Sequence, residues 1–290
     1  MGDNIKFYLI LLSELVFFPF LYIKEQISKW RSVNIKLRYR LPVDKDLPVR
    51  VVIHEWGGYD ISRWKNVNNI SSFKCGLKYQ MERFANIPNV KLHVTISDSH
   101  LFKYKEFLCK YDSDVSFVPN KGMDFAGYKF FYDLVKTKRN SYVILTNSSV
   151  NSDISLFLDG YIEYLNANQD VGMLGISYCT SMWQTLIRPN FRPHLQSFFL
   201  MTTVDVLNEL VSLNHNKFPG CDITNKRLLI RNGEVFISSL VEKLGYRLAV
   251  VNPIDGKPYK FESYKFWKLP FGDIRQFVDQ PNKITMINND

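Results

Sequence analysis

Short apolar runs alternate with longer amphipathic stretches along the chain from residue 49 onward. Apolar runs rich in β-branched and aromatic residues predict strands, and apolar positions with helical spacing predict helices. The predicted strands are residues 49–54, 90–97, 115–119, 141–147, 171–177, 197–203 and 246–251. The predicted helices are residues 74–86, 126–137, 153–167, 204–213 and 233–244. This alternation is typical of an α/β fold whose mainly parallel sheet carries helices on both faces.

An apolar segment, IKFYLILLSELVFFPFLYI at residues 5–23, precedes this pattern. It contains Lys6, Glu14 and Pro19, and a carboxylate near the centre of a spanning helix costs a few kcal/mol. The segment has no small-residue cleavage site, which argues against a signal peptide. Attachment to the surface of a membrane is the favoured interpretation. A spanning helix and a helix packed on its own domain are the alternatives.

A basic run follows the apolar segment and carries +5 of the formal net charge of +9. Such a run beside an apolar stretch favours an anionic lipid surface, and its cations do not lie on a recognition helix of the kind that binds nucleic acid. We therefore expect membrane attachment and no nucleic-acid partner. The charged residues of this run are Lys24, Glu25, Lys29, Arg31, Lys36, Arg38 and Arg40.

These patterns divide the chain into a membrane-proximal segment (1–45), an α/β domain (46–252) and an irregular, aromatic-rich tail (253–290) expected to wrap the domain. Hydrophobic residues make up 46% of the chain, enough for a large core. The four cysteines are widely spaced and form no CxxC pair, which is typical of free thiols in a reducing compartment. The expected location is the inner face of the cytoplasmic membrane. The oligomeric state is not determined by the sequence.

Polar residues follow several predicted strands at the point where each strand ends. Ligands of parallel α/β sheets bind at the carboxyl ends of the strands, so these residues are the candidates for a binding site. Gly122 permits a positive φ or a close backbone approach, and Asp124 either contacts a ligand or caps the helix that it opens. The candidates are His54, Asp98, Asn120, Gly122, Asp124, Asn147 and Ser149.

The stretch NKGMDFAGY (120–128) resembles the N-x-G-x-D signature of the rhamnan synthesis protein F family, which has a GT-A-like fold. Members of that family are glycosyltransferases of bacterial surface-polysaccharide assembly. Three further stretches resemble the family in order and spacing: VVIHEWGGYD (51–60), RPHLQSFFLMTT (192–203) and NGEVFISSLVEKLGYRLAVV (232–251). The resemblance covers residues 49 to 251.

The resemblance implies transfer of a sugar from a nucleoside diphosphate donor, a UDP- or dTDP-sugar, to a polysaccharide or lipid-linked acceptor. The seven strand-end residues would bind the donor, and Glu234 would be the general base of an inverting reaction. Helix capping is the alternative role for Glu234. Arg188, His194 and Gln196 are candidates for acceptor binding, with a purely structural role as the alternative for His194. A non-catalytic subunit of a polysaccharide-assembly complex is the alternative function.

The sequence leaves a requirement for Mg²⁺ or Mn²⁺ open. Asn147-Ser148-Ser149 occupies the place of the family's metal-binding Asp-x-Asp but contains no carboxylate, and hard cations prefer carboxylate oxygens. Asp124 or Asp153 would be the metal ligand if a metal binds. Otherwise Lys121, Arg188 or Arg192 would balance the charge of the diphosphate.

Overall fold

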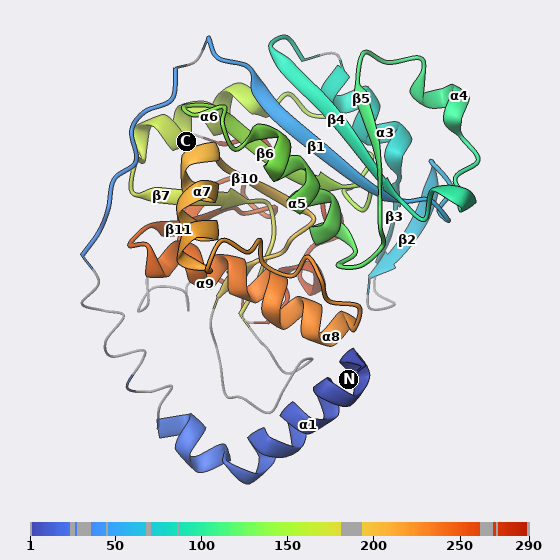
Figure 1. Cartoon of the computed structure of the whole chain (residues 1–290). Helices are drawn as coiled ribbons and strands as arrows, with labels where there is room; N and C mark the ends of the chain where they lie inside the picture. Colours follow the sequence, from blue (N-terminus) through green and yellow to red (C-terminus); the bar gives the residue numbers. More distant parts are fainter. Residues whose placement is uncertain are drawn as a thin grey trace.

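Eight strands form one sheet in the order β12-β11-β7-β10-β6-β1-β4-β5 (Figure 1). The computed structural model describes residues 2–23, 27, 36–44, 46–67, 71–85, 87–180, 193–261, 269–270 and 272–288. All seven predicted strands are present, and the α/β fold is confirmed. The strands are β1 (Val49–Trp56), β4 (Val90–Ser97), β5 (Asp114–Val118), β6 (Tyr142–Asn147), β7 (Val171–Gly175), β10 (Phe199–Thr203), β11 (Arg247–Val251) and β12 (Pro258–Lys260).

The sheet is mainly parallel. β1 runs parallel to both of its neighbours, β4 and β6, and the pairs β4–β5 and β7–β11 are also parallel. β10 runs antiparallel between β6 and β7, and β12 lies antiparallel on the edge beside β11. The carboxyl ends of β1, β4 and β6 therefore meet at one edge, as the sequence predicted.

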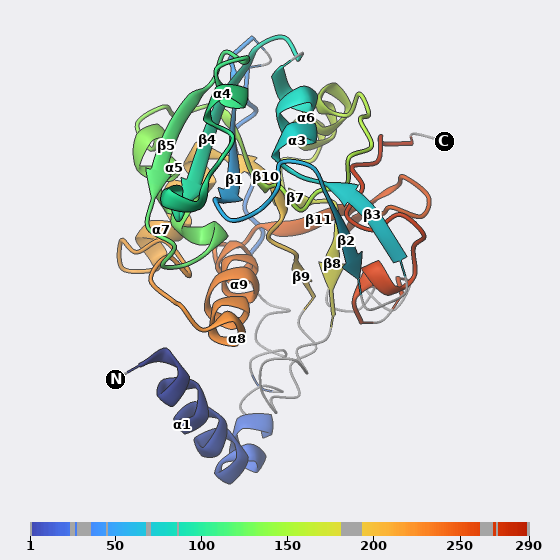
Figure 2. The same cartoon turned by 90° about the vertical axis from the view of Figure 1, so that its right-hand side faces the viewer.

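Helices cover both faces of the sheet, which explains why its central strands are buried along their whole length (Figure 2). On β1, Val51 and Ile53 belong to the core under α3 and α6, while Val52 belongs to the core under the other helices. This alternation follows from the two-residue period of a strand. The helices are α3 (Leu77–Ala85) and α6 (Leu158–Ala167) on one face, and α5 (Asp124–Val135), α7 (Val204–Leu213) and α9 (Phe236–Lys243) on the other.

Three predicted helix starts were wrong by three or more residues. The helix expected at residues 74–86 begins at Leu77, because residues 71–75 form a strand. The helix expected at residues 153–167 begins at Leu158, because the preceding residues contact the C-terminal tail: Ser155 Oγ donates to the Ile284 carbonyl at 2.8 Å. The helix expected to begin at Gly233 starts earlier, with the side chain of Asn225 accepting from Leu228 N–H. It continues as α8 (Lys226–Leu229), a π-helical turn η2 (Ile230–Val235) and α9.

Several short elements were not predicted. The most important is the hairpin of β2 (Arg63–Val67) and β3 (Ser71–Cys75). At two positions of β2 the burial is the reverse of an ordinary strand's, since Lys65 is half-buried while Trp64 is 64% exposed. A strand ordinarily buries its apolar residues and exposes its charged ones. Exceptions such as an inward-facing lysine are most frequent at functional sites. The others are α4 (Lys105–Leu108), β8 (Tyr178–Cys179), β9 (His194–Leu195), η1 (Ser99–Leu101) and η4 (Ile274–Gln276).

The N-terminal apolar segment forms the helix α1 (Asp3–Val16), which lies beside α8 in both views (Figure 1, Figure 2). Phe7 is buried against Leu228, and the buried carboxylate of Glu14 pairs with Arg231 at 2.9 Å. Glu14, one of the polar residues that interrupt the apolar segment, thus faces the protein, whereas Lys6 is exposed. Among the described helices, none is long and apolar enough to cross a membrane.

Two helical glycines provide a test of how tightly α5 is seated on the sheet. A Cβ added to Gly127 of α5 would overlap His54 Nδ1 and Thr95 Oγ1, whereas one added to Gly160 of α6 would meet only Ile287 at 3.9 Å. Gly127→Ala is expected to destabilise the protein by about 1–3 kcal/mol through overpacking. Gly160→Ala is expected to stabilise it by up to about 1 kcal/mol through helix propensity.

Thermal unfolding of the two variants measures this difference. Each kcal/mol corresponds to roughly 2–4 °C in a protein of this size, so the two melting temperatures should move in opposite directions. Equal melting temperatures would contradict the close packing of α5 on His54.

Candidate active site

A cavity of about 600 Å³ opens at the carboxyl ends of β1 and β6. Its walls come from β2, the start of α5, the η2 turn and η4. Seven of the residues predicted from sequence line it together, although they come from five separate stretches of the chain. These residues are His54, Asn120, Asp124, Asn147, Ser149, Gln196 and Glu234.

Asp98 does not line the cavity but holds two residues that do. Its Oδ2 accepts hydrogen bonds from Trp56 Nε1 at 2.6 Å and from Asn120 Nδ2 at 2.7 Å. Trp56 and Tyr59 contact each other edge to face, with 4.8 Å between ring centroids, and both line the cavity. Asp98 thus positions an aromatic wall suited to contact with a base or a sugar.

Gly122 acts through the backbone rather than as a cavity residue. Its φ is +109°, and an added Cβ would lie 2.5 Å from the Cys221 carbonyl oxygen. Met123 follows with φ of 48° and is the N-cap of α5, without a side-chain cap hydrogen bond. Helix capping is therefore not the role of Asp124, which is the first residue of the helix.

The Asp124 carboxylate pairs instead with the end of β6. Asn147 Nδ2 donates to Asp124 Oδ2 at 2.6 Å, and Asn147 Oδ1 accepts from Ser149 N–H at 2.9 Å. The backbone N–H of Ser149 fixes the orientation of the Asn147 amide, because only an oxygen can accept from it. The amide nitrogen consequently faces Asp124, and both polar atoms of the Asn147 side chain are engaged.

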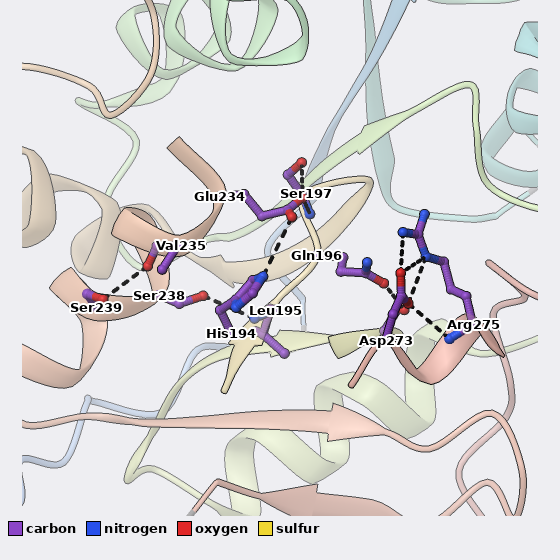
Figure 3. Close-up of polar contacts among 11 residues, drawn as sticks. His194, Leu195, Gln196, Ser197, Glu234, Val235, Ser238, Ser239, Asp273 and Arg275 are labelled. Carbon is purple, nitrogen blue, oxygen red and sulfur yellow. Dashed lines mark hydrogen bonds and ion pairs between the residues drawn. The ribbon is translucent and has the colours of Figure 1, made fainter. Parts of the chain in front are cut away.

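Glu234 projects from the π-helical turn towards the segment before β10 (Figure 3). Its Oε2 accepts from both Ser197 N and Ser197 Oγ at 2.8 Å, and its Oε1 lies 3.7 Å from His194 Nε2. Tyr128 Oη donates to the Ser197 carbonyl at 2.8 Å and so ties α5 to the same segment. π-Helical turns inside α-helices are frequent at functional sites.

The environment of Glu234 keeps its carboxylate ionised. Burial pushes the pKa of Glu234 upward, but the facing His194 and the two Ser197 donors outweigh burial and hold the pKa below its ordinary value. Capping does not describe this residue, since the helix begins eight residues earlier at Lys226. An ionised carboxylate on a cavity wall is a suitable proton acceptor.

His54 is buried and lines the cavity beside Asp124. Burial lowers the pKa of His54, and the Asp124 charge opposes this shift only in part, so the imidazole is neutral. Its Nδ1 lies 3.0 Å from Thr95 Oγ1. Its Nε2 lies 3.5 Å from Ser97 Oγ, so both ring nitrogens face hydroxyl groups of β4.

A buried ion pair connects β1, β2 and the end of β6 at the wall of the cavity, which Glu55 and Ser148 line. Glu55 accepts from Arg63 Nη1 at 3.2 Å and from Ser148 Oγ at 2.7 Å, and Arg63 Nη2 donates to Ser148 Oγ at 2.7 Å. Burial raises the pKa of Glu55, against the lowering effect of Arg63. This network seats the β2–β3 hairpin against the strand ends.

Three cations that the sequence did not indicate line the cavity: Lys65 of β2, Lys226 of α8 and Arg275 of η4. The cation proposed from sequence, Lys121, does not line it and lies 3.9 Å from Asp222, with both side chains mostly exposed. The inverted pattern of β2 was the only local signal for Lys65, and Arg275 lies in the tail, where no pattern marked it.

The oxygen ligands that a tightly bound Mg²⁺ or Mn²⁺ needs are not assembled here. Within the described ranges, no group of three His, Cys, Asp or Glu side chains could hold a metal ion. Asp153 does not line the cavity; its carboxylate pairs with Lys283 of the tail at 2.5 Å. Asp124 has the Asn147 amide nitrogen beside it instead of a second carboxylate. The residues present do not fit a divalent metal.

The acceptor candidates have different positions. Gln196 lines the cavity, and Ser177 Oγ donates to its Oε1. His194 is 2% exposed and lies behind Glu234, so it contacts the carboxylate rather than the cavity. Arg188, with Arg192, lies outside the described residues.

The chain is similar to several solved structures of transferases. Over 72% of its length it matches 90% of the 4-diphosphocytidyl-2C-methyl-D-erythritol synthase of Anaerococcus prevotii, at 10% identity and a TM-score of 0.44. It matches 74% of the glucosyl-3-phosphoglycerate synthase of Mycobacterium tuberculosis, solved with UDP, over 73% of its own length, at 10% identity and a TM-score of 0.41.

A third similar structure is a mannosyltransferase from Pyrobaculum calidifontis in complex with GDP-mannose and Mn²⁺, with 11% identity and a TM-score of 0.41 over 83% of this chain and 66% of that one. No protein-family model and no curated protein matches the chain. With TM-scores below 0.5, these likenesses do not decide its chemistry, which depends on the residues of the cavity.

Proposed function

We propose that this protein is an inverting glycosyltransferase that moves a sugar from a nucleoside diphosphate donor to a lipid-linked or polysaccharide acceptor of the cell surface. The resemblance of NKGMDFAGY and the three further stretches to the rhamnan synthesis protein F family supports this proposal. UDP- and dTDP-sugars are the proposed donors.

The observation that carries the proposal is the meeting of Glu234, Asp124 and Asn147 in one cavity with the aromatic wall of Trp56 and Tyr59. A nucleotide sugar needs a surface for its base, polar groups for its ribose and sugar, and a base for the incoming hydroxyl. The cavity provides each of these at the carboxyl ends of the strands, where α/β sheets bind ligands.

In this reaction the acceptor oxygen attacks the anomeric carbon from the side opposite the diphosphate. A bond forms between that oxygen and the carbon, the bond from the carbon to the diphosphate oxygen breaks, and the acceptor proton passes to Glu234. Ser197 donates to Oε2 of Glu234 and His194 lies 3.7 Å from Oε1, so the carboxylate is held in place on the cavity wall to receive the proton. One carboxylate suffices because the diphosphate is already an activated leaving group.

The N-terminal helix supports an acceptor at a membrane. α1 has one exposed stripe of apolar residues, formed by those that do not face α8. The helical residues 18–23 contain a second group of exposed apolar residues. Because α8 contributes Lys226 and Leu229 to the cavity wall, a membrane bound to α1 would lie close to the cavity. We propose attachment to the cytoplasmic face of an anionic membrane. The exposed residues are Ile5, Tyr8, Leu9, Leu12, Leu15, Val16, Phe17, Phe18, Phe20, Tyr22 and Ile23.

The test is a panel of UDP-, dTDP-, GDP- and CMP-sugars, assayed for slow donor hydrolysis and for thermal stabilisation. A donor at 100 times its Kd stabilises the folded state by about 2.7 kcal/mol, which corresponds to roughly 5–10 °C here. Stabilisation with turnover is the expected result. Stabilisation without turnover on any acceptor favours a non-catalytic binding subunit, and neither effect with any donor would contradict the proposal.

A further inference from the structure

The cavity contains an unbalanced cation where a metal would be expected. Lys65 extends from β2 into the cavity, and in the described part of the chain its ammonium has no hydrogen-bond partner. Burying a lysine without a partner is costly. Four charged or titratable groups face it: Cys75 of β3, Arg275 of η4, Asp124 of α5 and Arg63 of β2.

These neighbours do not neutralise Lys65. Cys75 is a buried thiol whose pKa is raised by burial. The Asp124 carboxylate offsets the charge of Lys65 only in part, because these two described side chains form neither a hydrogen bond nor an ion pair. Arg63 is already paired with Glu55. Burial lowers the pKa of Lys65 to about 8, with Arg275 and Arg63 adding to this effect and Cys75 and Asp124 opposing it. The site therefore holds a cation that an incoming anion would stabilise.

Arg275 is held beside Lys65 by the tail. Its Nε donates to both oxygens of Asp273, at 2.9 and 3.0 Å, and Asp273 is 7% exposed (Figure 3). Its Nη2 also donates to Asp273 Oδ2, so this carboxylate anchors the guanidinium while it lines the cavity. Its position is fixed before a ligand arrives, which reduces the entropy lost on binding.

Three residues that could offer oxygen ligands each have one side-chain oxygen in a hydrogen bond within the protein. Glu234 Oε2 accepts from Ser197, Asn147 Oδ1 accepts from Ser149 N–H, and Asp124 Oδ2 accepts from the Asn147 amide. A divalent ion between Asp124 and Asn147 would face the amide NH₂, which donates and does not ligate. The charge of a diphosphate has to be balanced by other groups.

Resting on the proposed glycosyl transfer, we infer that Lys65, assisted by Arg275, binds and neutralises the leaving diphosphate in place of a divalent metal. As the bond between the anomeric carbon and the diphosphate oxygen breaks, its electron pair stays on that oxygen. Lys65 donates a hydrogen bond to the new charge and keeps its proton, while the acceptor proton passes to Glu234. Fixed donors aimed at developing charge are a large source of rate enhancement.

Lys65→Met tests this directly, because methionine keeps the apolar stem and removes the charge. Lys74→Ala is the matched control, since Lys74 lies on the paired strand β3 next to Trp64 and does not line the cavity. Affinities for UDP, dTDP and GDP are measured in EDTA, together with those for the matching nucleosides. Loss of one charged hydrogen bond is expected to lower diphosphate affinity roughly 10- to 100-fold, leave nucleoside affinity unchanged, and leave the control unaffected.

The pH dependence of kcat/KM is a second measurement, and a purely structural role of Lys65 would not change it. Lys65 is charged below its pKa of about 8 and neutral above it, so kcat/KM for the donor should fall about tenfold per pH unit on the alkaline side. An arginine stays charged throughout this range, so Lys65→Arg should remove the alkaline fall. Melting temperatures of all variants confirm that each is folded.

The outcomes separate the inference from the function on which it rests. Turnover that is unchanged in EDTA and lost in Lys65→Met supports both. Turnover that EDTA abolishes and Mn²⁺ restores, or a Lys65→Met variant with normal diphosphate affinity, overturns the inference and leaves the glycosyltransferase proposal standing. A protein that binds no nucleoside diphosphate and hydrolyses no donor, with or without metal, overturns both.

Discussion

Replacing Glu234 with Gln is expected to lower the kcat for sugar transfer roughly 100- to 10,000-fold, the usual contribution of a general base. The pKa of Glu234 lies below its ordinary value because His194 and Ser197 outweigh the effect of burial, so the wild-type carboxylate is ionised at neutral pH. Glutamine has nearly the same shape, and its carbonyl oxygen can still accept both hydrogen bonds from Ser197. Donor affinity and melting temperature should therefore change little while turnover falls.

Steady-state transfer and donor binding are measured on the same preparations, with Glu106→Gln as the control. Glu106 is an exposed carboxylate of α4 that does not line the cavity, so its replacement should leave kcat unchanged. Near-normal turnover of Glu234→Gln would remove this residue from the mechanism. A large fall in melting temperature would instead assign Glu234 a structural role between η2 and the segment before β10.

Replacing Leu9, Leu12 and Phe20 together with glutamate is expected to abolish membrane attachment. These three residues belong to the exposed apolar groups of α1 and residues 18–23. Leu9, Leu12 and Phe20 are 50%, 60% and 71% exposed, so their replacement should not disturb the contact of α1 with α8. Each side chain contributes about 1 kcal/mol or more when its exposed apolar surface enters the lipid interface. The combined loss, with repulsion from anionic headgroups, corresponds to a fall in partitioning on the order of 100-fold or more.

Co-sedimentation with vesicles of phosphatidylcholine and phosphatidylglycerol measures this effect. The control carries glutamates at Leu156, Ile254 and Met286, which are also exposed apolar residues, so the change in net charge is the same. It should bind vesicles as the wild type does. If the α1 variant still sediments with vesicles, the attachment lies elsewhere on the protein.

Point substitutions are preferable to deletion of the N-terminal segment. Arg40 is buried, with Nε donating to the Val171 carbonyl at 2.6 Å and Nη2 donating to the Leu165 carbonyl. Val43 belongs to the core under α3 and α6. Removing residues 1–40 would therefore open the domain itself, and a loss of membrane binding could not be assigned to α1.

The sequence determined the sheet and the location of the cavity. The strands β6, β7 and β10 are mainly apolar runs because both of their faces are covered, and such runs can be recognised locally. Parallel strands bring their carboxyl ends to one edge, so polar residues following those runs had to converge. His54, Asn120, Asp124 and Asn147 were found in this way, as was the positive φ of Gly122, although the close approach of the Cys221 carbonyl to Gly122 is a tertiary contact.

The tertiary structure alone decided which charges share the cavity. Lys65 comes from β2, where it shares the inward face with Arg63 and Val67, and Arg275 comes from a tail far along the chain, so neither follows a local period. The π-helical turn that aims Glu234, and the Arg231 partner that buries Glu14 against the protein, depend on contacts between distant segments. The spacing of apolar residues in the sequence predicts which face of a helix or strand is buried. Which buried charges pair with each other depends on how separate helices and strands pack together.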